Sequence, residues 1–256
     1  WYRWSNKTEH IVIEEGITGI GSEAFAGFVK VLSVNIPYTV KKIKRNSFEN
    51  NYRLREIQIP NEVISIGDKA FAGCHGLKNL SLPSKLNYVG SFEFCKNIKS
   101  ISLPDSTKDT ADGMFTGCEM LTSVKLPRKL KAIKAYDFAD CRKLTKLNIP
   151  VTVKVVYMSA FAGSGLKKIV LPSNVQKIRN GNDGQKVFEY IKGIGYPTKN
   201  LRVIEIHSKK VKSIQKNSFS GLSSKVVIKV PKSKKKKYTK MLRKSGLSKK
   251  VKICNL

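Results

Sequence analysis

The sequence predicts a β-rich solenoid of about nine stacked rungs of 23 residues, with a parallel sheet on one face. Two recurring residues predict this fold class. A phenylalanine returns at steps of mostly 23 residues, at Phe25, Phe48, Phe71, Phe94, Phe115, Phe138, Phe161, Phe188 and Phe219. A proline keeps the same period, at Pro37, Pro60, Pro83, Pro104, Pro127, Pro150 and Pro172, with Pro231 closing the series.

The residues before each proline have the pattern of a short strand. In the rung that ends at Pro83, Leu80 and Leu82 flank the polar Ser81, which is the alternation of a strand. The proline has no N–H to donate and therefore marks the end of the strand ladder. Because one rung cannot bury its own apolar face, we expect the strands of successive rungs to pair in parallel, about 4.8 Å apart.

The phenylalanine of each rung is expected to form the central column of the core. Two apolar residues after the proline, such as Val63 and Ile66, lead to it. A small residue, often followed by glycine, comes after it and turns the chain into the next rung. Two departures interrupt the period: a 21-residue rung through DSTKDTADGMF, and the longer segment at residues 178–200.

Cys74 stands beside His75, as a thiol nucleophile and its base or two metal ligands would, but the repeat favours a structural role. Three more cysteines recur near the same turn, at Cys95, Cys118 and Cys141. The histidines are isolated, and no Cys-x-x-Cys or His-x-x-x-His spacing occurs. A hydrolase would need its nucleophile, base and orienting group in one cleft. We therefore expect no catalytic residues, no metal and no cofactor.

The unit NEVISIGDKAFAGCHGLKNLSLP, residues 61–83, resembles the BspA-like leucine-rich repeat, and the resemblance covers about residues 8–231. It implies a leucine-rich repeat solenoid on a bacterial surface or in the extracellular medium, which binds rather than catalyses. Its partners would be a host matrix protein, a cell-surface protein or a glycan. The opening WYRWSNKTEH has none of the features of a signal peptide.

Residues 232–256 are expected to form a basic C-terminal cap on the last rung, after a solenoid over residues 1–231. KVVIKVPKSKKKKYTKMLRKSGLSKKVKI resembles the family's β-α-β cap. Ser233 is the expected helix N-cap, Tyr238, Met241 and Leu242 share one face, and Gly246 ends the helix.

Outward-facing strand residues are the first candidates for ligand binding. In each rung they lie four and two positions before the proline. The candidates are Asn35, Gln58, Asn79, Ser81, Ser100, Ser102, Ser123, Lys125, Lys146, Asn148 and Lys168. Such a polar face can hold an extended peptide or a glycan. The alternative is a merely solvated face, since these positions must be polar for solubility and the face lacks the Trp and Tyr that anchor many interfaces.

The irregular segment at residues 178–200 is a second candidate, because insertions in repeat proteins often lie on a binding face. Its candidate residues are Asn182, Asp183, Tyr190 and Tyr196. The order of ligands in a calcium-binding EF-hand loop is absent, and the alternative is a plain extended turn.

A net charge of +31, from 49 Lys and Arg against 18 Asp and Glu, predicts attraction to polyanions. The basic run supplies candidate attachment residues at Lys234, Lys235, Lys236, Lys237 and Lys240. An anionic cell-wall polymer such as teichoic acid is the expected partner, and a wall-associated spacer is the alternative function. Sequence-specific binding of nucleic acid is not expected, since the run has little Arg and no aromatic platform. No apolar run has the length of a membrane span.

Overall fold

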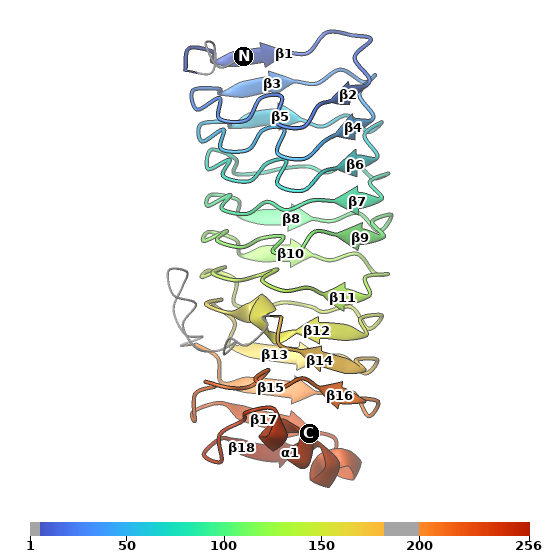
Figure 1. Ribbon diagram of the computed structural model, residues 1–256, viewed down its shortest axis with the longest axis vertical. Coiled ribbons are helices and arrows are strands. Elements are labelled where there is room, and N and C mark those ends of the chain that lie inside the picture. The colour runs from blue at the N-terminus through green and yellow to red at the C-terminus, as the bar shows by residue number, and fades with distance from the viewer. Residues whose placement is uncertain (1–5, 182–199) are drawn as a thin grey trace. The chain divides into compact units, whose positions relative to one another are not determined.

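The computed structural model describes residues 6–181 and 200–256, and the chain divides into two compact units, residues 1–127 and 128–256. Each unit is a parallel β-solenoid with turns of about 23 residues, which confirms the predicted fold class (Figure 1). Strands of successive rungs pair with the offset of the repeat, so that His10 lies opposite Ser33.

In the first unit, strands before the prolines form one side of the solenoid and strands after them form the other (Figure 1). The first side holds two sheets, made of β1 (His10–Val12), β3 (Ser33–Asn35) and β5 (Glu56–Gln58), and of β8 (Ser100–Ser102) and β10 (Ser123–Lys125). The second side is one sheet of two-residue strands, made of β2 (Gly19–Ile20), β4 (Lys42–Ile43), β6 (Ser65–Ile66), β7 (Tyr88–Val89) and β9 (Asp109–Thr110).

The second unit has the same two-sided arrangement. One sheet contains β13 (Lys168–Leu171), β15 (Val203–Ile206), β17 (Val227–Val230) and β18 (Lys252–Asn255). The other contains β11 (Ala132–Ile133), β12 (Val155–Tyr157), β14 (Lys177–Arg179) and β16 (Ser213–Ile214). Among its described residues, 128–181 and 200–256, the helices are the 3-10 helices η1 (Met158–Phe161) and η2 (Lys232–Lys234) and the α-helix α1 (Lys235–Lys244).

The core of the first unit is a stack of parallel phenylalanine rings, as predicted, but one member of the predicted column is wrong. Phe71 stacks on Phe92 and Phe92 on Phe115, with ring centroids 6.1 Å apart in both pairs. Phe92 is fully buried, whereas Phe94 is 39% exposed. The spine therefore runs through Phe92, and the step of 21 residues falls between Phe71 and Phe92.

The physical reason is a shortened turn. Gly67 lies four residues before Phe71, but the equivalent Gly90 lies only two residues before Phe92. Two residues are therefore missing ahead of the ring, and counting eleven residues from Pro83 leads to Phe94 instead. The shortened stretch is therefore not DSTKDTADGMF, where the phenylalanine spacing predicted it.

The shift also places Cys95 in the same register as Cys74 and Cys118, three residues after a core ring. Each thiol donates to the backbone oxygen of the preceding rung's phenylalanine: Cys74 to Phe48 at 3.1 Å, Cys95 to Phe71 at 3.0 Å and Cys118 to Phe92 at 3.2 Å. All three side chains are fully buried and free of disulfides. Burial raises the pKa of the Cys74 thiol well above its ordinary value and that of Cys95 to about 12. These cysteines are packed side chains that bond the rungs together.

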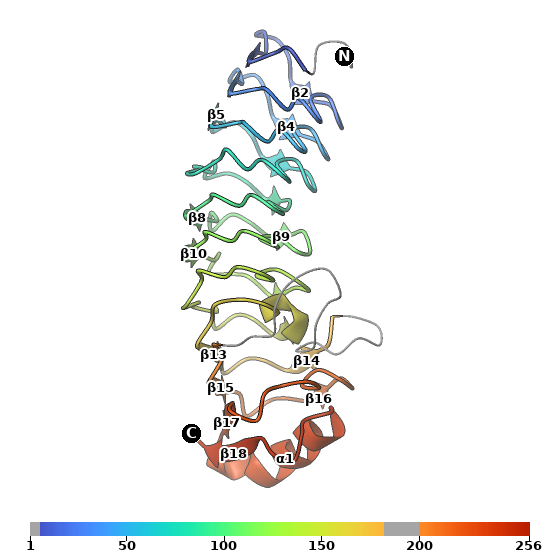
Figure 2. The same ribbon diagram turned by 90° about the vertical axis from the view of Figure 1, so that its left-hand side faces the viewer.

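A strand, a helix and a strand end the chain, and α1 packs against β16 and β18 (Figure 2). Tyr238 and Leu242 are its buried residues, while Met241 is only half-buried. Ser233 is not the N-cap, because η2 occupies residues 232–234 and α1 starts after Lys234 without a side-chain cap. Within residues 6–181 and 200–256, no helix combines the length and apolar character needed to cross a membrane.

Candidate ligand-binding surfaces

All eleven predicted strand-face residues are exposed. In the first unit, the alternation along β8 shows why: Ile101 points into the core and is 4% exposed, while Ser100 and Ser102 on either side face solvent. The strand pattern thus correctly predicted which side chains face outward. Exposure alone does not distinguish a binding surface from a solvated one.

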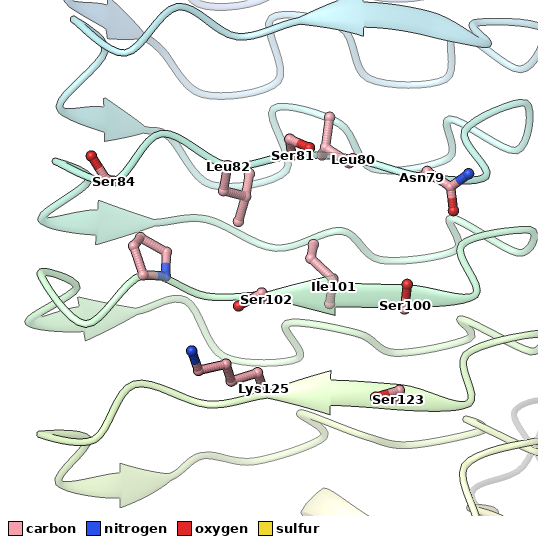
Figure 3. A pocket seen from close by; sticks show the side chains of 11 residues that line it. Asn79, Leu80, Ser81, Leu82, Ser84, Ser100, Ile101, Ser102, Ser123 and Lys125 are labelled. Atoms are coloured by element: carbon pink, nitrogen blue, oxygen red, sulfur yellow. The ribbon is translucent and has the colours of Figure 1, made fainter.

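Six of the eleven residues come together around a groove of about 630 Å³ in the first unit (Figure 3). They are Asn79, Ser81, Ser100, Ser102, Ser123 and Lys125. Ser84, Leu80, Leu82, Ile101 and Pro104 complete its lining. We call this surface the serine groove. Most of its polar groups are short hydroxyls, each able to donate and accept a hydrogen bond.

The serine groove lies where the strand ladder is interrupted. Residues 79–82 form no strand and pair with β8 only through an isolated bridge between Asn79 and Ser100. Among the described residues, neither Ser81 nor Leu82 makes a backbone hydrogen bond to a neighbouring rung. Five of the eleven lining residues are serines, so much of the polar lining beside this gap consists of short side chains.

The predicted face residues of the second unit have different surroundings. Lys146 and Asn148 precede Pro150 in a segment that forms no strand. Lys168 begins β13, and its Nζ lies 2.9 Å from Oε2 of Glu205 on β15. The ion pair between Lys168 and Glu205 could not be predicted from the spacing of the repeat, because the irregular segment at residues 178–200 lies between the two strands.

Glu205 is the centre of a charged cluster on this face. His207 Nε2 lies 3.0 Å from its carboxylate and Lys229 Nζ lies 3.5 Å from it, in addition to Lys168. Burial alone would raise the pKa of the Glu205 carboxyl, but the hydrogen bonds and charges of these partners outweigh it and hold the pKa at about 2. The carboxylate is therefore ionised at any physiological pH and holds the side chains of Lys168, His207 and Lys229 together.

Most of the positive charge lies in the second unit. Residues 128–256 contain 33 Lys and Arg and five Asp and Glu, a net charge of +28, whereas residues 1–127 contain 16 and 13, a net charge of +3. Of the predicted attachment residues, Lys235, Lys236, Lys237 and Lys240 are exposed on α1, and Lys234 is half-buried at the end of η2. No acidic residue follows Glu205 in the sequence.

The candidates of the irregular segment, Asn182, Asp183, Tyr190 and Tyr196, lie outside the described residues, as does Phe188. Across the parts of the chain that the structure describes, no group of three or more His, Cys, Asp or Glu is arranged to hold a metal ion.

A second depression of the first unit has a volume of about 390 Å³ and was not predicted from the sequence. Tyr52, His75 and Phe94 line it at the turns that follow the core rings, together with Lys69, Glu93 and Lys96. We call it the turn cleft. His75 lies in the aligned position of Tyr52, one rung on, and Phe94 occupies a turn position that other rungs give to Gly, Asn or Asp. That substitution was visible in the sequence, but the wrong choice of core ring concealed it.

The known proteins to which this chain is similar agree with this architecture. The profile of the family described as "BspA type Leucine rich repeat region" matches six copies, over residues 1–94, 90–194 and 189–255. Among curated proteins, none matches the chain.

Three solved structures are similar. A leucine-rich repeat protein from Bacteroides ovatus is 26% identical with a TM-score of 0.63, over 96% of this chain and 70% of its own. A leucine-rich repeat protein from T. pallidum is 29% identical with a TM-score of 0.55, over 59% and 73%. A leucine-rich cell surface protein from Faecalibacterium prausnitzii is 21% identical with a TM-score of 0.52, over 79% and 60%, and shows the fold alone.

Proposed function

Because the chain belongs to the BspA-type leucine-rich repeat family, we propose that it is a non-enzymatic binding module, secreted or displayed on a bacterial surface, whose strand face holds its ligand. The likeness in fold to a leucine-rich cell surface protein supports the location. The serine groove is the observation that carries the binding role, because it gathers predicted face residues from three successive rungs in one hollow.

The groove best fits an extended segment of a host matrix or cell-surface protein. An extended chain presents N–H and C=O groups in regular alternation, and short hydroxyls can bond both. Ser100, Ser102 and Ser123 are small enough to let a peptide backbone approach the floor. Lys125 at one end adds a site for a carboxylate of the ligand.

The lining of the groove favours binding over catalysis. A serine nucleophile needs an adjacent base to remove its proton. None of the residues that line the groove is His, Asp, Glu or Cys. Its one titratable side chain, Lys125, is exposed, whereas a lysine that serves as a catalytic base is typically buried.

The experiment is a binding panel of host matrix proteins, with heparin and teichoic acid as polyanion controls, at low and high salt. A ligand of the serine groove is expected to remain bound at high salt, because ions screen only the charge-driven component. Ser100→Arg and Ser102→Arg should abolish that binding by filling the groove. Ser224→Arg, at an exposed site of the second unit, is the matched control and should bind normally. Equal binding by all variants would refute a role for the groove, whereas capture of a glycan instead of a protein would correct the ligand class.

A second candidate function is a wall-associated spacer that holds anionic polymers. The charge of +28 on residues 128–256 favours it, together with the exposed lysines of α1. Teichoic acid binding should then weaken when Lys235, Lys236, Lys237 and Lys240 are changed to Gln. It should be unaffected by Ser100→Arg, which separates the two candidates.

A further inference from the structure

Phe94 has a backbone conformation that a bulky residue rarely adopts. Its φ is 58°, in the left-handed region, where aromatic side chains are disfavoured. The same position in other rungs of the first unit is held by Gly27, Asn50, Gly73 and Gly117, all with positive φ. A hydrogen bond of 2.7 Å from the Phe94 N–H to the Thr116 carbonyl fixes the strained turn. Strain of this kind, maintained by the surrounding structure, is concentrated at functional sites.

The strained turn places the Phe94 ring at the surface, where it lines the turn cleft together with Tyr52 and His75. Phe94 is 39% and Tyr52 43% exposed, and Tyr52 stacks on His75 with ring centroids 5.1 Å apart. A Cβ on Gly117 would lie 2.5 Å from Cδ1 of Phe94, so the ring rests directly over that glycine. Ala72 and Gly73, two small residues, also line the turn cleft. Three aromatic side chains thus surround a hollow lined in part by small residues.

The charged residues that line the turn cleft are two lysines, Lys69 and Lys96, and two glutamates, Glu49 and Glu93, so the lining carries no net charge. Lys69 Nζ lies 3.4 Å from Glu93, and Lys96 Nζ lies 3.8 Å from Glu119, so both lysines at the cleft are paired with carboxylates. Burial first, and the charge of Lys96 second, lower the pKa of His75 and keep its ring neutral near pH 7. Neither an anionic nor a cationic ligand gains a net electrostatic advantage here.

We propose that the turn cleft binds a pyranose ring of an uncharged glycan. A pyranose has an apolar C–H face that suits the rings of Tyr52, His75 and Phe94. Its hydroxyl groups can donate hydrogen bonds to the carboxylates of Glu49 and Glu93 and accept them from the ammonium group of Lys69. The amide of Asn50 can both donate to them and accept from them. The volume of about 390 Å³ is within the range of small-molecule sites, roughly 300–1,000 Å³. The turn cleft thus has the aromatic side chains that the strand face lacks.

The test is calorimetric titration of the full chain with three uncharged trisaccharides: mannotriose, chitotriose and maltotriose. Mannotriose represents host glycans, chitotriose represents the N-acetylglucosamine of bacterial walls, and maltotriose represents plain glucose polymers. We expect at least one to bind, with an affinity unchanged between about 50 mM and 500 mM NaCl because the sugar carries no charge.

Two substitutions and two controls assign the site. Phe94→Asn restores a residue type that Asn50 shows to be compatible with this turn, and Tyr52→Ser removes a second aromatic ring of the cleft. Each is expected to weaken sugar binding by about tenfold or more, as for the loss of a central aromatic contact. Tyr38→Ser, at an aromatic residue 65% exposed outside the cleft, and Ser100→Arg, in the serine groove, should leave sugar binding unchanged.

No binding of any of the three sugars at millimolar concentration, or equal binding by the Phe94→Asn protein, would overturn the assignment. Because Ser100→Arg affects only the serine groove, failure of sugar binding and failure of protein binding are separate outcomes.

Discussion

Two phenylalanines in the stretch SFEF, Phe92 and Phe94, show how much a single residue's place in the rung determines. Phe92 is fully buried between two parallel rings, whereas Phe94 lies at the surface with a positive φ. The two residues are chemically identical and only two positions apart. Their contributions to stability should therefore differ through packing and backbone strain alone.

Phe92→Ala is expected to lower the free energy of unfolding by about 3–5 kcal/mol, because it leaves a cavity in the core stack. Phe94→Asn should change it by no more than about 1 kcal/mol, since relief of left-handed strain offsets the loss of partly exposed packing over Gly117. Denaturant unfolding followed by circular dichroism measures both. A larger loss for Phe94→Asn than for Phe92→Ala would restore Phe94 to the core.

Thiol chemistry gives a second prediction at the scale of the residue. Cys74, Cys95, Cys118 and Cys141 are fully buried, and Cys254 on β18 is only half-buried. Because the thiolate is the reactive form, burial makes the core cysteines inert, and the raised pKa values of Cys74 and Cys95 add to this. An aromatic disulfide reagent should label Cys254 in the native protein and all five cysteines in denaturant. Rapid native labelling of Cys74 would reopen a reactive role for it.

At the scale of the element, the sequence predicted the strands better than it predicted what interrupts them. Ser100, Ile101 and Ser102 alternate in burial as the strand period requires. The gap in the ladder at residues 79–82 was not predictable, because Leu80 and Leu82 keep the strand pattern although only Asn79 is bridged. The hydrophobic pattern of the sequence shows which side chains are apolar. The two residues missing before Phe92 change the spacing of the backbone, and the hydrophobic pattern does not show that change. The serine groove and the turn cleft both lie beside this shortened rung.

Helix α1 is attached to the second unit through a buried tyrosine. Tyr238 is fully buried, its hydroxyl donates to the Ser208 carbonyl at 3.0 Å, and it accepts from the Val211 N–H at 3.0 Å. Tyr238→Phe should cost about 1–3 kcal/mol of unfolding free energy, because the Val211 N–H is left buried without its acceptor. Chemical denaturation of this variant and of Tyr38→Phe, at an exposed site, makes the comparison. Equal stability of the two variants would mean that the hydrogen bonds contribute nothing to docking.

The carboxylate on β15 should make the second unit sensitive to acid. The pKa of Glu205 in the folded protein is about 2, below the ordinary value of 4.5 that applies when the chain is unfolded. Its stabilisation is therefore complete above about pH 5 and is lost as the pH falls towards 2; it amounts to at most about 3 kcal/mol. Glu205→Gln should be less stable than the parent protein at pH 7, and the difference should shrink by pH 3.

Unfolding curves at pH 7, 5 and 3 measure this difference, with Glu56→Gln, at an exposed site on β5, as the control. A difference between Glu205→Gln and the parent that stays constant with pH would show that the ion pairs with Lys168 and Lys229 contribute nothing.

At the scale of the whole molecule, charge divides the chain in two. Residues 1–127 carry +3 and contain the serine groove and the turn cleft, and residues 128–256 carry +28. A nearly neutral unit suits recognition by shape and hydrogen bonding, because polyanions do not compete strongly for it. A strongly basic unit suits attachment to an anionic polymer. The two candidate functions are therefore compatible, with recognition in one unit and anchoring in the other.

The lysines in the first turn of α1 allow the proposed anchoring role of the second unit to be tested, because their positive charges at this position are expected to destabilise the helix. Lys235, Lys236 and Lys237 occupy the first turn, which contains no acidic residue, and positive charge at a helix N-terminus opposes the helix dipole. Changing all three to Gln should raise the unfolding free energy at low salt, by about 0.3–1 kcal/mol for each residue. The gain should diminish as salt screens the charges, from about 10 mM to about 500 mM NaCl.

Lys249→Gln with Lys250→Gln, at exposed lysines outside the helix, is the control and should give a smaller gain. If the triple substitution raises stability and also weakens teichoic acid binding, the lysines are retained at the expense of the fold, which is expected of residues selected for attachment. A triple variant that is less stable at low salt would show that the lysines support the helix, and the case for anchoring through α1 would fail.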